Sequence, residues 1–118
     1  MLYMVATESS NLMSQMRRGA TEYCVLALLR DREMYGFELT RALSSEGGLV
    51  ASEGTVYPLL SRIRQDELVE TFWESSPQGP PRRYYRLTSD GHLALEAFRI
   101  QWCQFRDTVD AIMKGNDE

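Results

Sequence analysis

The strongest constraint on the fold is the spacing of large apolar residues in the last quarter of the chain. Six of them are separated by 3, 4, 3, 4 and 3 residues: Leu95, Phe98, Trp102, Phe105, Val109 and Ile112. This spacing puts all six on one face of an α-helix, in a pattern typical of coiled coils. A helix from about Asp90 to Met113 would outreach a small domain, because it rises about 1.5 Å per residue. We therefore predict dimerisation through these six residues, with a core helix of a monomer as the alternative.

Four earlier segments show helical periodicity. A short amphipathic helix with Met16 on its apolar side ends before Gly19. A second helix, capped by Thr21, is apolar on all sides, as expected for a central helix. Two further helices are predicted over Tyr35–Ser45 and Ser52–Asp66. The chain is thus mainly helical up to Asp66.

Between the fourth helix and the last one the pattern becomes extended. Leu68–Glu74 is rich in β-branched and aromatic residues, and three of the four prolines fall in Ser75–Pro81, which cannot be helical. Arg82–Leu87 returns as a second strand. We predict a mainly α fold with a two-stranded β-hairpin (α+β). It is a winged helix-turn-helix domain over residues 1–88, followed by a long C-terminal dimerisation helix over 89–118.

The charge distribution permits binding to nucleic acid although the net charge of the 118 residues is −4. Thr55–Gln65 contains two arginines and no acid, and Pro77–Thr88 contains three arginines and no acid. Six acids and only three bases lie in Ser89–Glu118. Both positive windows fall on the predicted helix-turn-helix and hairpin, so a basic face can coexist with an acidic remainder.

A winged helix-turn-helix inserts its second helix into the major groove of DNA and lays its hairpin along the backbone. The start of the helix over Ser52–Asp66 offers free backbone amides and short polar side chains. On the second strand, alternation puts Arg82 and Arg83 on opposite faces, with Arg83 on the more buried one. An ordinary solvated surface is the alternative for any single residue. The predicted DNA contacts are Tyr35, Ser52, Thr55, Tyr57, Arg62, Arg82 and Arg83.

Other functional classes have little support in the sequence. The single histidine, His92, has no nucleophile or carboxylate at a recognisable spacing, so we expect no catalytic site, no metal and no cofactor. Cys24 and Cys103 lie in apolar helical patterns and are expected to be buried free thiols. With no membrane span and no signal peptide pattern, we expect a cytoplasmic protein. A winged-helix module that binds proteins rather than DNA stays open as an alternative.

Three motifs resemble the PadR family of transcriptional regulators. They are Tyr35-Gly36, then Ser52-x-Gly-Thr-Val-Tyr-Pro58-x-Leu-x-Arg-Ile63, then Arg82-Arg-Tyr-Tyr-x-Leu-Thr-x-x-Gly91. The resemblance implies a repressor that binds a palindromic operator as a homodimer. Pro58, which would kink an ordinary helix, belongs to the pattern. Glu67 departs from the family pattern, which usually has glycine at this position. The residue at which the fourth helix ends is therefore left undetermined by the sequence.

The resemblance also implies a small aromatic effector. Some members of the family have a C-terminal helix similar to this one, among them multidrug-responsive ones. They bind flat aromatic drugs between the two subunits, stacked on a tryptophan. The matching position here is Trp102, and Phe98, Phe105 and Met16 are the other predicted ligand contacts. A purely structural aromatic dimer core is the alternative.

Overall fold

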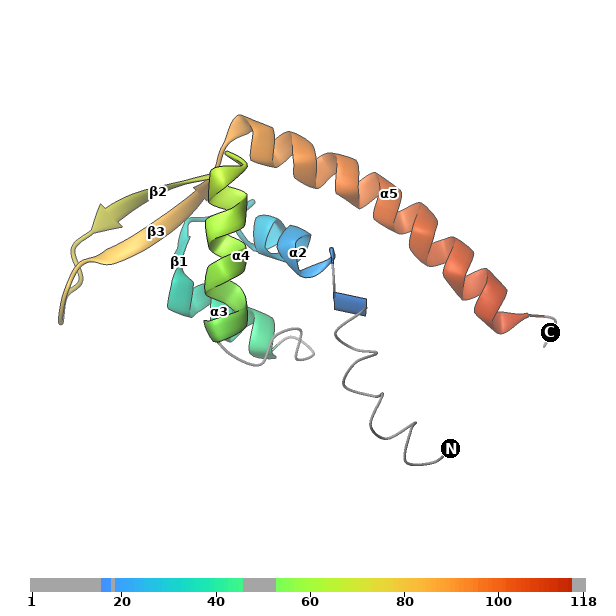
Figure 1. The fold of residues 1–118 in the computed structure, drawn as a ribbon, viewed down its shortest axis with the longest axis horizontal. Coiled ribbons are helices and arrows are strands. Elements are labelled where there is room, and N and C mark those ends of the chain that lie inside the picture. The colour runs from blue at the N-terminus through green and yellow to red at the C-terminus, as the bar shows by residue number, and fades with distance from the viewer. Residues whose placement is uncertain (1–15, 18, 46–52, 116–118) are drawn as a thin grey trace, which may run out of the picture.

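The polypeptide alternates helices and short strands before it ends in one long helix. The computed structural model describes residues 16–17, 19–45 and 53–115. Met16 and Arg17 are helical, and the rest of the first predicted helix lies outside the described residues. In chain order the elements are α2 (Thr21–Leu28), β1 (Met34–Tyr35), α3 (Gly36–Ser45), α4 (Glu53–Gln65), β2 (Val69–Glu74), β3 (Arg82–Leu87) and α5 (Ser89–Lys114) (Figure 1).

The sheet has three antiparallel strands in the order β1-β3-β2, one more than predicted. Tyr35 was expected to open a helix, but it pairs with Tyr84 in β1, and α3 begins one residue later at Gly36. Two residues are too few to show the alternation that marks a strand in a sequence. The winged-helix architecture, the α+β class and the β2–β3 hairpin are confirmed, and β1 is an additional strand that was not predicted.

The core lies where α2, α3 and α4 meet the inner face of the sheet. Its fully buried side chains come from these three helices, and Val69, Tyr85 and Leu87 join them from the sheet. Tyr85 and Leu87 therefore face inward, as the strand alternation predicted. Cys24 and Cys103 are free but only partly buried, which corrects the expectation of buried thiols.

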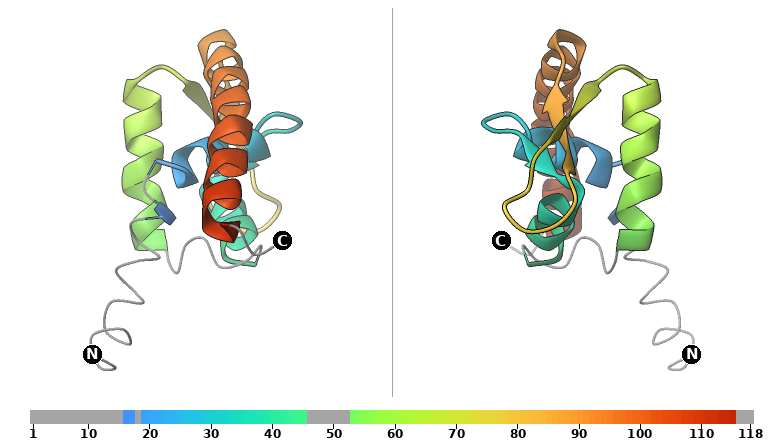
Figure 2. Two further views of the ribbon diagram at one scale, coloured as in Figure 1. Left: turned by 90° about the vertical axis from the view of Figure 1, so that its right-hand side faces the viewer. Right: turned by 90° about the vertical axis from the view of Figure 1, so that its left-hand side faces the viewer.

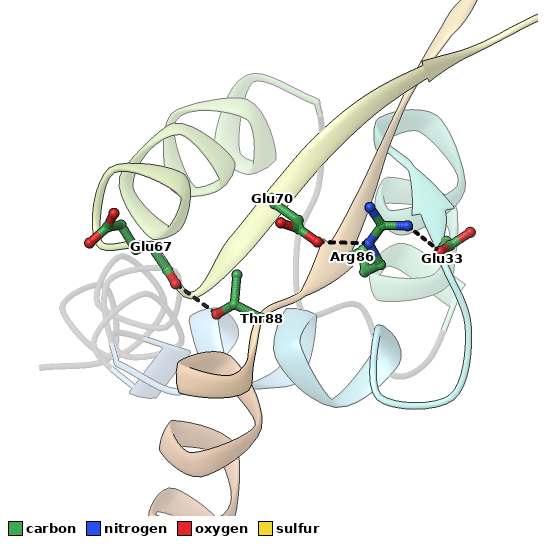
Figure 3. Close-up of polar contacts among 5 residues, drawn as sticks. All are labelled: Glu33, Glu67, Glu70, Arg86 and Thr88. Atoms are coloured by element: carbon green, nitrogen blue, oxygen red, sulfur yellow. Dashed lines mark hydrogen bonds and ion pairs between the residues drawn. The ribbon is translucent and has the colours of Figure 1, made fainter.

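A set of close backbone contacts joins the sheet to α5. The Thr88 hydroxyl accepts a hydrogen bond from the Gly91 N–H (3.0 Å), which caps α5, and donates one to the Glu67 carbonyl (2.7 Å) (Figure 3). The Thr88 N–H donates to the Leu68 carbonyl. A β-carbon added at Gly91 would run into the same carbonyl oxygen, so only glycine fits this first turn. These contacts fix the direction in which α5 leaves the domain.

The chain leaves α4 through a left-handed residue that is not glycine. Glu67 has φ 61°, and the N–H groups of Glu67 and Leu68 donate to the carbonyls of Arg64 and Ile63. This pair of bonds is the Schellman arrangement that usually has glycine at the left-handed position. The helix ends at Gln65, and the Glu at position 67 holds the conformation that glycine adopts without steric strain.

We expect Glu67→Gly to raise the free energy of unfolding by about 1 kcal/mol, because glycine removes the steric cost of the left-handed conformation. Urea unfolding of the two proteins measures the difference. Asp66→Gly is the matched control, since it removes a carboxylate from the same turn at a residue without positive φ. The Asp66→Gly protein should be less stable than the wild type. An equal gain in the free energy of unfolding in Glu67→Gly and Asp66→Gly would assign the effect to the loss of a charge instead.

Candidate DNA interface and ligand groove

The first turns of α4 are exposed and lie toward the same end of the molecule as α3 and the tip of the β2–β3 hairpin (Figures 1 and 2). Thr55 and Tyr57 are exposed there, whereas Val56 is fully buried and anchors this end of the helix in the core. Ser52 lies outside the described residues. Pro58 lies inside α4, which continues through it to Gln65.

Two of the three family-like motifs meet at Gly36. A β-carbon added there would lie 2.6 Å from Cε1 and 2.8 Å from the hydroxyl oxygen of Tyr57. The Tyr57 ring therefore lies across the first turn of α3, in space that only glycine leaves open. This contact sets how closely the exposed starts of α3 and α4 approach each other.

Arginine side chains cover the aromatic residues of the sheet. On the outer face, the guanidinium of Arg82 lies 4.5 Å from the centre of the Tyr35 ring, and Tyr35 contacts Tyr84 edge to face. On the inner face, the guanidinium of Arg83 lies 5.6 Å from the centre of the exposed Trp73 ring. Cation–π contacts of this kind hold a guanidinium in place while it keeps its charge. The two arginines predicted to contact DNA are thus positioned along the hairpin.

The third arginine of this strand is neutralised by two carboxylates. Arg86 forms ion pairs with Glu33 (3.0 Å) and Glu70 (2.9 Å) (Figure 3). Hydrogen bonds to Glu33 and Glu70 raise the pKa of Arg86. Together the two ion pairs connect the turn before β1 to the base of the hairpin. The positive window that the sequence suggested over residues 77–88 is therefore reduced to Arg82 and Arg83.

Arg62 points toward α2 rather than to open solvent. Its Nη2 atom lies 3.2 Å from Oε2 of Glu22, a residue in the first turn of α2. Arg62 is one of the predicted DNA contacts, and its side chain is exposed beside this ion pair. The sequence could not show that a carboxylate from another helix occupies the place expected for a phosphate, because the two residues are 40 positions apart.

The four predicted ligand contacts lie around one groove between α5 and the residues that precede α2. Its volume is about 720 Å³, and Met16, Gly19, Ala20, Phe98, Trp102, Phe105 and Val109 are among its lining residues. The rings of Phe98, Trp102 and Phe105 follow one another at centroid distances of 6.1 and 6.2 Å. Tyr23 extends the row, since it stacks on Phe98 at 4.1 Å. It was missed because it falls in the uniformly apolar run of the second helix.

The six residues of the apolar face of α5 divide into two groups. Leu95 is only 6% exposed and belongs to the core of its own domain, which corrects its assignment to the dimer contact. Phe98 is partly covered by Tyr23. Farther along, Trp102 is 40%, Phe105 63% and Ile112 71% exposed. The second half of α5 thus presents an apolar surface to its surroundings.

The described part of the chain contains no group of three or more His, Cys, Asp or Glu residues that could hold a metal ion. Among these residues there is also no helix with both the length and the apolar character needed to cross a membrane.

Comparison with known proteins identifies the family. The Transcriptional regulator PadR-like family matches residues 25–97, which contain α3, α4, the whole sheet and the start of α5. The chain belongs to the PadR-like family. Its members are transcriptional regulators, not enzymes.

Two relatives illustrate the similarity. A transcriptional regulator of Mycobacterium tuberculosis is 37% identical over 83 residues, which are 70% of this chain and 76% of the relative. The crystal structure of a PadR-like transcriptional regulator from Bacillus cereus is 37% identical, with a TM-score of 0.79 over 86% of this chain and 99% of that one.

A third structure, that of Bacillus subtilis PadR, was determined in complex with operator DNA. It is 24% identical to this chain, with a TM-score of 0.64 over 70% of this chain and 48% of that one. At this identity the similarity shows only that the two proteins share a fold.

Gly36→Ala should lower the free energy of unfolding by about 1–3 kcal/mol, because the added methyl group overlaps the Tyr57 ring and forces it to move. In a Tyr57→Ala background the same substitution should have almost no effect, since the ring is gone. Urea unfolding of the four proteins forms a double-mutant cycle. An equal loss in both backgrounds would show that Gly36 is required for a reason other than Tyr57.

Proposed function

We propose that this PadR-like regulator binds a palindromic DNA operator as a homodimer and represses transcription from it. The exposed start of α4, with Thr55 and Tyr57, would enter the major groove. Arg82 and Arg83 of the hairpin would contact the backbone on either side of it. The observation that carries this proposal is that the start of α4 and the tip of the hairpin lie toward the same end of the molecule (Figures 1 and 2). Such a regulator acts in the cytoplasm, where bacterial DNA lies.

The exposed apolar half of α5 supports the homodimer. Phe105, Val109 and Ile112 would leave a large apolar surface in water unless another subunit covers it. A two-fold dimer carries two copies of α4 and reads two half-sites about 34 Å apart, which explains why the operator should be palindromic.

The groove beside Trp102 supports control by a small aromatic compound. It is lined by three aromatic rings and is large enough for a drug-sized molecule, since such sites measure about 300–1,000 Å³. A flat compound stacked on Trp102 would bias the dimer toward an arrangement that no longer fits the operator. A plain aromatic dimer contact is the alternative use of the same surface.

Salt dependence of binding tests the DNA proposal. With a duplex from the region upstream of the protein's own gene, the affinity should fall steeply as salt rises, because phosphate contacts release counterions. Arg82→Gln and Arg83→Gln should each reduce the slope of log K against log salt by about one. Fluorescence anisotropy of the labelled duplex measures both.

Arg99→Gln is the matched control, because Arg99 pairs with Glu96 on α5, away from the hairpin, and its loss should leave the slope unchanged. If the wild type does not bind the duplex even at low salt, the alternative of a winged-helix module that binds proteins is favoured.

A further inference from the structure

The start of α2 touches both the groove and the helix proposed to enter DNA. Gly19 and Ala20, immediately before α2, form part of the groove wall. Tyr23 in its first turn stacks on Phe98 with an interplanar angle of 4°. Its neighbour Glu22 forms the ion pair with Arg62 of α4. Two consecutive residues therefore contact the two functional regions of the molecule.

A continuous row of stacked rings connects the first turn of α2 to the groove. The rings of Tyr23 and Phe98 are nearly parallel at 4.1 Å, and Phe98 and Trp102 are inclined by only 12°. A flat molecule that stacks on Trp102 competes for the space beside Phe98. Because stacked rings cannot interpenetrate, a shift of Phe98 changes the position of Tyr23.

The polar side connects α2 to α4 directly. Among the ion pairs of the described residues, Glu22 with Arg62 is the one that joins these two helices. The Glu22 side chain is only 18% exposed, so its carboxylate is held at the contact between the helices. A movement of the first turn of α2 therefore changes the distance between this carboxylate and the Arg62 guanidinium.

The first turn is the part of α2 that a shift of Phe98 would reach first, through Tyr23. Its N-cap residue, Ala20, makes no side-chain capping bond, and Gly19 precedes it in a left-handed conformation. Val25 and Leu26, which follow the first turn, are fully buried and fix the rest of the helix in the core. A displacement at the groove would therefore act mainly on the turn that carries Glu22 and Tyr23, where the buried Thr21 donates a hydrogen bond to the Arg17 carbonyl.

We propose that Glu22 and Tyr23 are positioning residues that transmit groove occupancy to the recognition helix α4. This inference rests on the proposed function and specifies how it is regulated. With the groove empty, Glu22 holds Arg62 and fixes α4 in the orientation that fits the operator. With an aromatic molecule stacked on Trp102, Phe98 displaces Tyr23, the ion pair opens and α4 loses that orientation.

The test measures how strongly an aromatic probe weakens operator binding. Anilinonaphthalene sulfonate is suitable because it fluoresces in apolar sites and its negative charge keeps it off DNA. Its site in the groove is established by loss of binding in Trp102→Leu. The ratio of operator Kd values at saturating and zero probe gives the coupling factor, expected to be about 5- to 150-fold in the wild type.

Glu22→Gln should reduce this factor about fivefold while the probe still binds, because one exposed ion pair contributes up to about that much. The combined exchange Glu22→Arg with Arg62→Glu should restore it. Glu96→Gln, which removes an ion pair within α5 alone, should leave the factor unchanged.

An unchanged factor in Glu22→Gln, or an equal reduction in Glu96→Gln, would overturn the role of α2 while the proposed function stands. If the probe binds the groove of the wild type without weakening operator binding, control by a groove ligand is contradicted, and the proposed route through α2 is contradicted with it.

Discussion

The apolar face of α5 is the feature on which the other parts of the structure depend. Its first turns are committed to the domain through Leu95 and through the stack of Phe98 on Tyr23. The Thr88 cap and the close approach of Gly91 to Leu68 set the direction of the helix. Beyond Trp102 the same face continues without cover from the other described elements. One helix therefore belongs to a core at one end and offers an apolar surface at the other.

This division explains why the aromatic groove lies where it does. The groove forms at the point where α5 leaves the domain, between the last covered ring, Phe98, and the exposed rings beyond it. The residues just before α2 close it on the other side. In a dimer, the same position would lie beside both the subunit contact and the helix that supports α4. A ligand site there is well placed to change the relation between subunits and DNA-contacting helices.

The sequence predicted the features that depend on periodicity and turn chemistry. The order of helices from α2 onward, the hairpin with its proline-rich loop and the long final helix all follow from local patterns, and the described part of the chain has them. Of the four ligand contacts that the family resemblance implied, Phe98, Trp102 and Phe105 share one face of α5, because spacing along a helix defines a face, and Met16 reaches the same groove from another segment. The end of the fourth helix was left open by the sequence, because Glu67 stands where the family has glycine and adopts the left-handed conformation only at a steric cost.

What the sequence could not show depends on contacts between distant segments. Counting charges placed Arg86 in a positive window of the sequence, but Glu33 and Glu70 approach it only in the folded sheet. The pairing of Arg62 with Glu22 has the same origin. Strand β1 forms because it pairs with the free edge of β3. Leu95 is buried in the core because α5 packs against α2. In each case the partner is set by tertiary packing.

Sedimentation equilibrium tests the central claim, that the exposed half of α5 joins two copies of the chain. The wild type should be a dimer, and Phe105→Glu should be a monomer with the same helix content, because a charge would be buried in the contact. Ile100→Glu is the matched control, since Ile100 is exposed on the other side of the same helix, and this variant should stay a dimer. A monomeric wild type, or a dimer that survives Phe105→Glu, would contradict the account.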